Sequence, residues 1–225
     1  MAESGKILEV KKKEQYRTVD ELIKRSEPSQ VYYTLLILSS FIVASGLLLN
    51  NPTIVIGGML ITPVLAPILM IALGLAIGRP DLMKDVGMSV VKSFLVIVAS
   101  SILLTFIFGG TDNYYVFENT VRTAALYFVV ALAAGVAATF AWTRKELAEV
   151  LPGIAIAVSL VPPLSLIGIS LSSFDFSIAR FSFLIFLLNM VGILVGSLVV
   201  FSLLKFYKTE KEVEKKVTEA NGKTS

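Results

Sequence analysis

The amino-acid sequence predicts an all-α polytopic membrane protein. Its six transmembrane helices would form two inverted three-helix repeats, with the second and fifth helices broken by proline. Of the 225 residues, 55% are hydrophobic and 16% are charged, and the mean hydropathy is +0.79. The hydrophobic residues occur in blocks of about 20, the length that an α-helix needs to cross a bilayer. Two of these blocks carry matching proline clusters, which indicate the repeat.

Apolar blocks locate the predicted spans along the chain. They lie near residues 31–49, 54–77, 86–108, 122–142, 150–171 and 180–204. The predicted parts of the chain are a basic leader at 1–30, a transmembrane domain at 31–204 with repeats at 31–108 and 122–204, and a charged tail at 205–225.

The basic leader is expected to contain a short amphipathic helix. Thr18 and Glu21 have the spacing of a capping box, and Val19 and Leu22 share one face of the helix that would follow. Because Lys residues surround this segment, we expect the helix to lie along the inner membrane surface, next to anionic lipid.

The distribution of basic residues predicts the orientation. Of the 20 Lys and Arg residues, all but Lys92, Arg122 and Arg180 fall in the leader, the tail, or the second and fourth connections. Lys and Arg are enriched in cytoplasmic segments of membrane proteins. We therefore expect a multi-pass protein of the cell membrane with both termini in the cytoplasm.

The two proline clusters match each other without a gap. Gly58 falls on Gly153 and Pro67 falls on Pro162 when residues 54–78 are placed over 150–172. In the predicted topology these two spans run in opposite directions, so the repeat would be inverted. Matched, interrupted spans in the two halves of a membrane protein indicate a transport site near the bilayer midplane.

Eight residues near these clusters are candidates for binding the permeating species. They are Gly58, Thr62, Pro63, Pro67, Ser159, Pro162, Pro163 and Asn189. Unwound backbone offers carbonyl groups to a cation and helix N-termini to an anion. The alternative is structural: the prolines would only kink the helices, the hydroxyls would bond to carbonyls one turn earlier, and Asn189 would join two helices.

Lys92 and Arg122 are candidates for a gating or charge role. Lys92 is an ionisable residue inside the third span, where a charge is costly, although its long side chain could extend to the membrane surface. Arg122 begins the fourth span and would either pair with Glu118 or attract anions to an outer vestibule.

The residues that the chain lacks exclude several classes of function. The chain contains neither His nor Cys, and no Asp or Glu lies inside a predicted span. We therefore expect no enzymatic activity, no cofactor and no metal site. Missing carboxylates also argue against proton-coupled and divalent-cation transport, which leaves neutral solutes, anions or Na⁺. Because no folded domain would present the basic residues, we expect no nucleic-acid partner.

Four sequence segments resemble a known family. They are Gly57–Pro67, Glu118–Thr123, Gly153–Leu164 and Leu188–Asn189, with Val161-Pro162-Pro163-Leu164 the most specific. Over about residues 35–204 the chain is similar to the bacterial and archaeal membrane proteins of domain of unknown function 389. Many members of that family carry a cytosolic domain before the membrane part, so the resemblance implies a minimal form here. It implies no activity.

The sequence therefore favours a transporter or channel-like permease for a small solute or ion, with its path between the second and fifth spans. The alternative is a membrane scaffold or sensor whose cytosolic tails bind partners. Small residues at four-residue spacing, such as Gly74 and Gly78 or Gly192 and Gly196, predict closely packed helices. The expected partners are the lipid bilayer, the solute, and further copies of the chain in a homo-oligomer.

Overall fold

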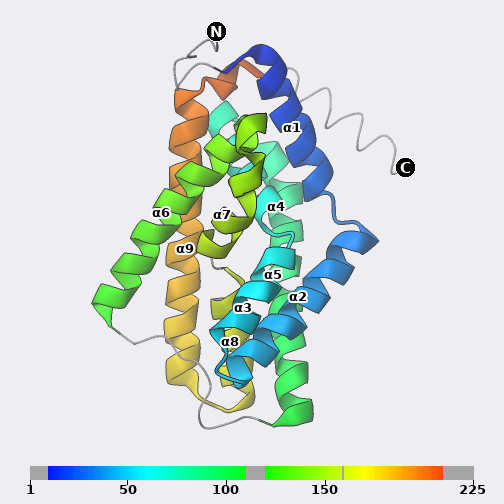
Figure 1. Cartoon of the computed structure of the whole chain (residues 1–225), viewed down its shortest axis with the longest axis vertical. Helices are drawn as coiled ribbons and strands as arrows, with labels where there is room; N and C mark the ends of the chain where they lie inside the picture. The colour runs from blue at the N-terminus through cyan, green and yellow to red at the C-terminus, as the bar shows by residue number, and fades with distance from the viewer. Residues whose placement is uncertain (1–9, 110–119, 159, 210–225) are drawn as a thin grey trace.

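The computed structural model describes residues 10–109, 120–158 and 160–209, which form an elongated bundle of helices (Figure 1). No strand occurs in these ranges. The first half consists of α1 (Lys12–Ser26), α2 (Gln30–Leu48), α3 (Pro52–Ile61), α4 (Leu65–Ile77) and α5 (Pro80–Phe108). The second half consists of α6 (Val121–Thr143), the 3-10 helix η1 (Lys145–Val150), α7 (Leu151–Val158), α8 (Val161–Ser172), α9 (Phe176–Leu203) and the 3-10 helix η2 (Phe206–Thr209).

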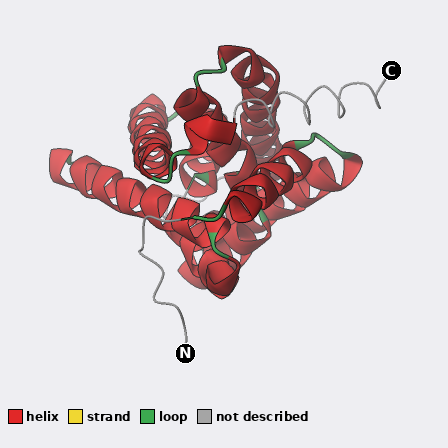
Figure 2. Cartoon of the chain, turned by 90° about the horizontal axis from the view of Figure 1, so that it is seen from above, coloured by secondary structure: helices red, strands yellow, loops and turns green. Residues whose placement is uncertain are grey.

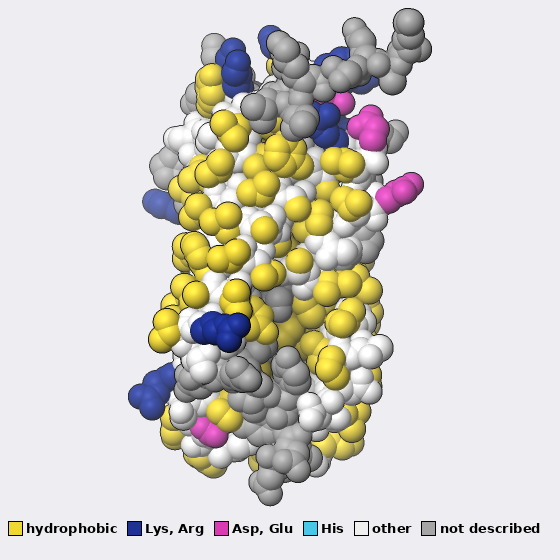
Figure 3. Space-filling model, turned by 60° about the vertical axis from the view of Figure 1, so that its left-hand side comes forward, with side chains coloured by type: hydrophobic (Ala, Val, Ile, Leu, Met, Phe, Trp, Pro, Cys, Tyr) yellow, Lys and Arg dark blue, Asp and Glu magenta, His cyan; other side chains and the backbone are white. Residues whose placement is uncertain are grey.

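The apolar helices are those of a membrane protein. Among the described residues, four helices are long and apolar enough to cross a bilayer: α2, α5 from Lys84 onward, α6 and α9. The pair α3 and α4, bent by 58° at its break, would be a fifth such element if the two helices form one span. Figure 3 shows hydrophobic side chains over the middle of one face, with charged side chains mostly towards its two ends. The predicted all-α membrane fold is confirmed at this level.

Polar side chains fix where several helices begin. Asn51 Oδ1 accepts hydrogen bonds from the backbone N–H groups of Thr53 and Ile54 at 3.1 and 3.4 Å, and Pro52 opens α3. The same capping role belongs to Ser29 for α2, Thr120 for α6 and Asp175 for α9. The first N–H groups of a helix lack partners within it, so these caps define the starts of helices locally.

The closest helix pairing joins α6 to α9 through small residues. A Cβ added at Gly192 would lie 2.8 Å from Ala131 Cβ, and one at Gly196 would collide with the Leu132 carbonyl oxygen. Ser197 Oγ also donates to the Gly135 carbonyl at 3.2 Å. The prediction that small residues at four-residue spacing allow close packing is confirmed for Gly192 and Gly196, which face α6 of the same chain.

Gly78 has a different role from the one predicted. It ends α4 in the left-handed conformation, at φ 73°, and a Cβ there would meet no atom within 4 Å. This glycine terminates the helix and packs against nothing, because a residue without Cβ adopts positive φ at little cost.

The leader helix packs its apolar face against the rest of the bundle. Helix α1 begins at Lys12, six residues before Thr18, and packs against α4 and α6. Val19 and Leu22 are fully buried in the protein core. An amphipathic face can bury itself against lipid or against protein, and here the bundle supplies the apolar surface. Viewed along the long axis, the outer helices splay away from a more compact centre (Figure 2).

Candidate functional site

The first helix break separates α3 from α4. Helix α3 ends at Ile61, and the backbone N–H of Thr62 still donates to the Met59 carbonyl at 3.3 Å. The Thr62 hydroxyl donates to the Gly58 carbonyl at 3.2 Å. Pro63 lies in the break, and Pro67 is the third residue of α4. An N–H group at that position has no acceptor within its own helix, so proline costs little there.

The second break separates α7 from α8 and has the same design. Helix α7 ends at Val158, and α8 begins at Val161. Pro162 and Pro163 are the second and third residues of α8, and both are buried. Ser159, a predicted site residue, lies outside the described residues. In both halves, the prolines therefore begin a second half-helix instead of kinking a continuous one.

The two breaks lie next to each other inside the protein. Between them is a void of about 20 Å³, the space of about one water molecule. It is lined by Met59, Thr62, Val64 and Leu65 from the first break and by Ala155, Val158, Leu160 and Val161 from the second. In Figure 1, α4 and α7 lie on the side of this crossing nearer α1, and α3 and α8 lie on the other side.

A cavity of about 670 Å³ approaches the crossing from the end of the molecule where α1 lies. Its lining comes from the junction of α1 and α2, from the first break, from α7 and from the end of α6. The lining residues are Lys24, Arg25, Glu27, Ser29, Val31, Tyr32, Leu35, Leu60, Thr62, Pro63, Leu65, Ala66, Trp142, Leu151 and Ala155. Thr62, Leu65 and Ala155 line both the cavity and the void. These three residues therefore separate the cavity from the crossing.

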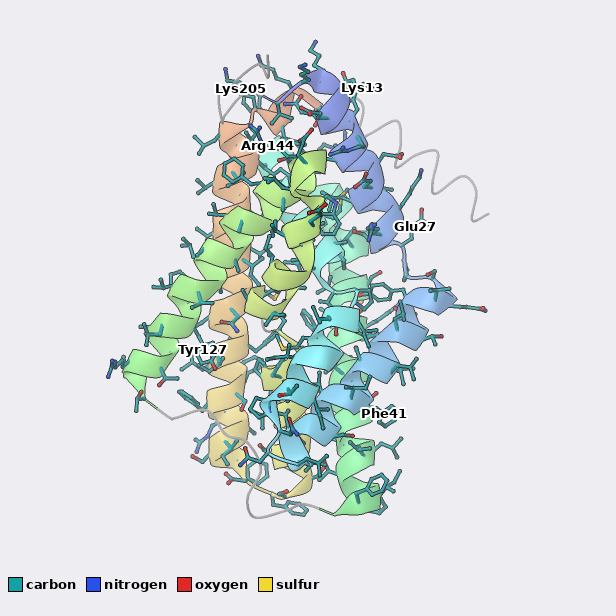
Figure 4. The ribbon with its side chains drawn as sticks, viewed as in Figure 1. Lys13, Glu27, Phe41, Tyr127, Arg144 and Lys205 are labelled. Carbon is teal, nitrogen blue, oxygen red and sulfur yellow. The ribbon has the colours of Figure 1, made fainter. Side chains whose placement is uncertain are left out.

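Charged and aromatic groups surround the mouth of this cavity. Arg25 Cζ lies 5.7 Å from the centroid of the Trp142 ring, a cation–π geometry. Lys24 Nζ pairs with Asp20 Oδ2 at 3.0 Å. Glu27, labelled in Figure 4 at the junction of α1 and α2, supplies one carboxylate. The lining thus has two basic residues and one acidic residue, and Asp20 pairs with one of the two basic residues.

Two buried polar groups near the site have no hydrogen-bond partner in the described structure. One is the indole Nε1 of Trp142, a residue that is 8% exposed. The Ser165 hydroxyl is the other, in a fully buried residue shortly after Pro163. Most membrane-helix hydroxyls here bond to a carbonyl one turn earlier, as Thr139 does to Gly135 at 3.0 Å. Ser165 makes no such bond.

The structure brings together only part of the predicted site. Thr62 and Pro63 line the cavity, whereas Pro67, Pro162 and Pro163 lie in the half-helices beside it. Gly58 is a packing residue, because a Cβ there would lie 2.6 Å from Val43 Cγ2 of α2. Asn189 is buried within α9, at 1% exposure. It lines neither the cavity nor the void.

The two charged candidates lie outside the site. Lys92 is exposed on the surface of α5, and Arg122 is exposed in the first turn of α6. Neither lines the cavity or the void. Glu118, the predicted partner of Arg122, lies outside the described residues.

No sequence pattern predicts that Arg25 and Trp142 share a cavity. They are far apart in the chain, and the leader that contains Arg25 is expected from its sequence to lie next to anionic lipid. Hydrogen bonds from α1 to the end of α6 bring them together, including one from Arg17 Nη2 to the Thr143 carbonyl at 3.3 Å.

Comparison with known proteins places this architecture in a family. An uncharacterised protein of Methanocaldococcus jannaschii is 23% identical over 192 residues, which cover 85% of this chain and 58% of the relative. This chain therefore spans less than two-thirds of that relative's length. No solved structure matches. The sequence profile of the family described as domain of unknown function (DUF389) matches residues 59–195. That match includes both helix breaks, and the chain belongs to this family.

Proposed function

We propose that the protein is a permease for a small solute or ion, with a path that runs through the cavity and between the two helix breaks. The observation that carries the proposal is the meeting of the breaks at a void, with a cavity that ends beside it. Broken helices at the middle of a membrane protein expose carbonyl groups and helix ends to a solute. The buried Ser165 hydroxyl adds an unused polar group in the same half-helix as Pro162.

The proposal includes six spans in two inverted repeats. The match of Pro67 with Pro162 is an offset of 95 residues, and the same offset relates the ends of three pairs of helices. It takes the end of α2 at residue 48 to the end of α6 at 143, and the end of α4 at 77 to the end of α8 at 172. It also takes α5 at 80–108 to residues 175–203, where α9 spans 176–203.

Packing between the halves supports the same arrangement. Helix α4 packs against α9, and its counterpart α8 packs against α5, while α3 packs against α7. A pseudo-two-fold axis that exchanges the halves would exchange the first two contacts and map the third onto itself. In this proposal α7 and α8 together form the fifth span, antiparallel to α3 and α4.

The proposed orientation places the cavity mouth in the cytoplasm. Lys13, Arg144 and Lys205 lie at the end of the molecule that carries α1 (Figure 4). Basic residues mark the cytoplasmic side, so the protein would sit in the cell membrane with its cavity open inward. We further propose that it is not an enzyme and that it assembles as a homo-oligomer.

Flux measurements in proteoliposomes test the proposal. Vesicles holding the protein are diluted into iso-osmotic potassium acetate, sodium chloride or glycerol, and swelling is followed by light scattering. We expect faster swelling than in empty vesicles for at least one solute. Ala155→Phe should abolish this flux, because residue 155 separates the cavity from the void.

The matched control is Ala125→Phe, which adds the same side chain at an exposed position of α6. If no solute moves, or if both variants retain the parental flux, the permease proposal fails. The alternative, a scaffold or sensor with partner-binding tails, would then be preferred.

A further inference from the structure

We infer that the cavity beside the first helix break binds a small organic anion that carries an apolar group, with Arg25 as its main polar contact and Trp142 as an aromatic wall. The physiological meaning of this site rests on the proposed permease function, for which it specifies the substrate class. Binding itself does not require transport.

Arg25 is the available cation of the cavity. No carboxylate lies within 4.0 Å of its guanidinium in the described structure, whereas Lys24 is already paired with Asp20. Stacking on Trp142 at 5.7 Å holds the guanidinium in place. A planar guanidinium presents several N–H donors to a carboxylate or phosphate, and it loses less freedom on binding when it is already stacked.

Trp142 supplies an aromatic surface beside the guanidinium. Its indole Nε1 is buried away from solvent, so a ligand in the cavity contacts the ring and not this donor. An anion in this cavity would therefore bind to Arg25 and pack its apolar part beside the indole.

The rest of the cavity is suited to an apolar body. Leu35, Leu60, Leu65 and Leu151 line it, together with Val31 at the start of α2. The volume of about 670 Å³ lies within the usual range for small-molecule sites. Among the lining residues, Glu27 is the one acidic group, against Lys24 and Arg25. Because Lys24 is paired with Asp20, the preference for an amphipathic anion over a neutral or cationic ligand rests on the Arg25 guanidinium.

Two sources could supply this chemistry: a soluble organic acid from the cytoplasm, or the headgroup of an anionic lipid. Val31 is 68% exposed at the edge of the cavity, so in the proposed orientation the mouth lies at the membrane interface. Both sources present an acidic group attached to hydrocarbon.

The only tryptophan of the chain reports on this site directly, because Trp142 lines the cavity. The full chain is reconstituted in phosphatidylcholine nanodiscs and titrated with hexyl phosphate. Trp142 fluorescence and isothermal titration calorimetry are the readouts. We expect saturable binding of hexyl phosphate, and no saturable binding of hexanol or hexyltrimethylammonium at equal concentrations. Equal binding of hexanol, or neither heat nor fluorescence change with hexyl phosphate, would overturn the inference.

Arg25→Gln should weaken hexyl phosphate binding by about tenfold or more, because a hydrogen bond to a charged group is lost. Lys84→Gln is the matched control: it removes one positive charge near the same end of the bundle, from a residue that does not line the cavity. Equal affinity of Arg25→Gln and the parent would overturn the assignment of Arg25.

Native mass spectrometry from mixed phosphatidylcholine and phosphatidylglycerol nanodiscs distinguishes the two sources. Retention of phosphatidylglycerol by the parent and its loss in Arg25→Gln would identify a lipid headgroup. Equal retention by both, combined with Arg25-dependent binding of hexyl phosphate, would identify a soluble anion. Binding without flux would refute the permease proposal alone, and flux without anion binding would refute this inference alone.

Discussion

The Gln15 side chain of α1 donates from Nε2 to the backbone carbonyl of Leu204, at 2.8 Å, just after the end of α9. The two residues are 189 positions apart, and Gln15 is 6% exposed. Arg17 and Thr18 make similar bonds to carbonyls at the end of α6, at 3.3 and 3.4 Å. Since the last carbonyls of a helix have no partner within it, α1 acts as a shared cap for two helices.

Gln15→Ala should therefore destabilise the protein. The substitution leaves a buried carbonyl without its donor, at a cost of about 1–3 kcal/mol. We expect a lower apparent Tm in detergent. Lys13→Ala is the control, because Lys13 is exposed on the same helix. Equal Tm values for the two variants would show that α1 is not held by this bond.

Gly196→Ala should loosen the α6–α9 pairing. The added Cβ would meet the Leu132 carbonyl oxygen, and backbone cannot move aside as a flexible side chain can. Overpacking of this kind costs about 1–3 kcal/mol. Gly57→Ala is the matched control on α3, since a Cβ there meets nothing within 4 Å. Thermal unfolding should separate the two variants, and a Tm loss confined to Gly57→Ala would contradict the assignment.

Cysteine labelling tests the proposed topology, and the chain has no native cysteine to interfere. Ser173→Cys should react with a membrane-impermeant maleimide from outside intact cells, and Glu146→Cys should react only after the cells are opened. Both positions are exposed at helix ends. Outside labelling of Glu146→Cys would refute both the orientation and the inverted repeat.

Replacing Pro162 and Pro163 together by Ala should join α7 to α8. Alanine restores two backbone donors, which can bond to carbonyls at the end of α7 and extend a continuous helix through the break. We expect solute flux to fall to the level of empty vesicles while the apparent Tm stays the same or rises. Pro52→Ala, in the exposed first turn of α3, controls for losing a proline. If the double variant retained the parental flux at matched expression, we would conclude that the prolines have only a structural role.

The sequence alone determined the features that depend on local chemistry. Apolar blocks of sufficient length predicted membrane helices, and the prolines located both helix breaks to within a few residues. Helix starts at Asn51 and Asp175 follow from caps that bond to N–H groups two or three residues later. Such features need no distant contact, so a single sequence contains the information.

Only the tertiary structure decided which surface each apolar or small residue would meet. Val19 and Leu22 share one helical face, whose pattern is the same whether it packs against lipid or against protein. In the structure this face is buried against the bundle. Gly58 and Gly78 are the same residue type, yet one packs against Val43 and the other ends a helix. Arg25 meets Trp142 because α1 binds the end of α6. Such contacts join residues distant in the chain, and their free energy depends on how whole helices dock.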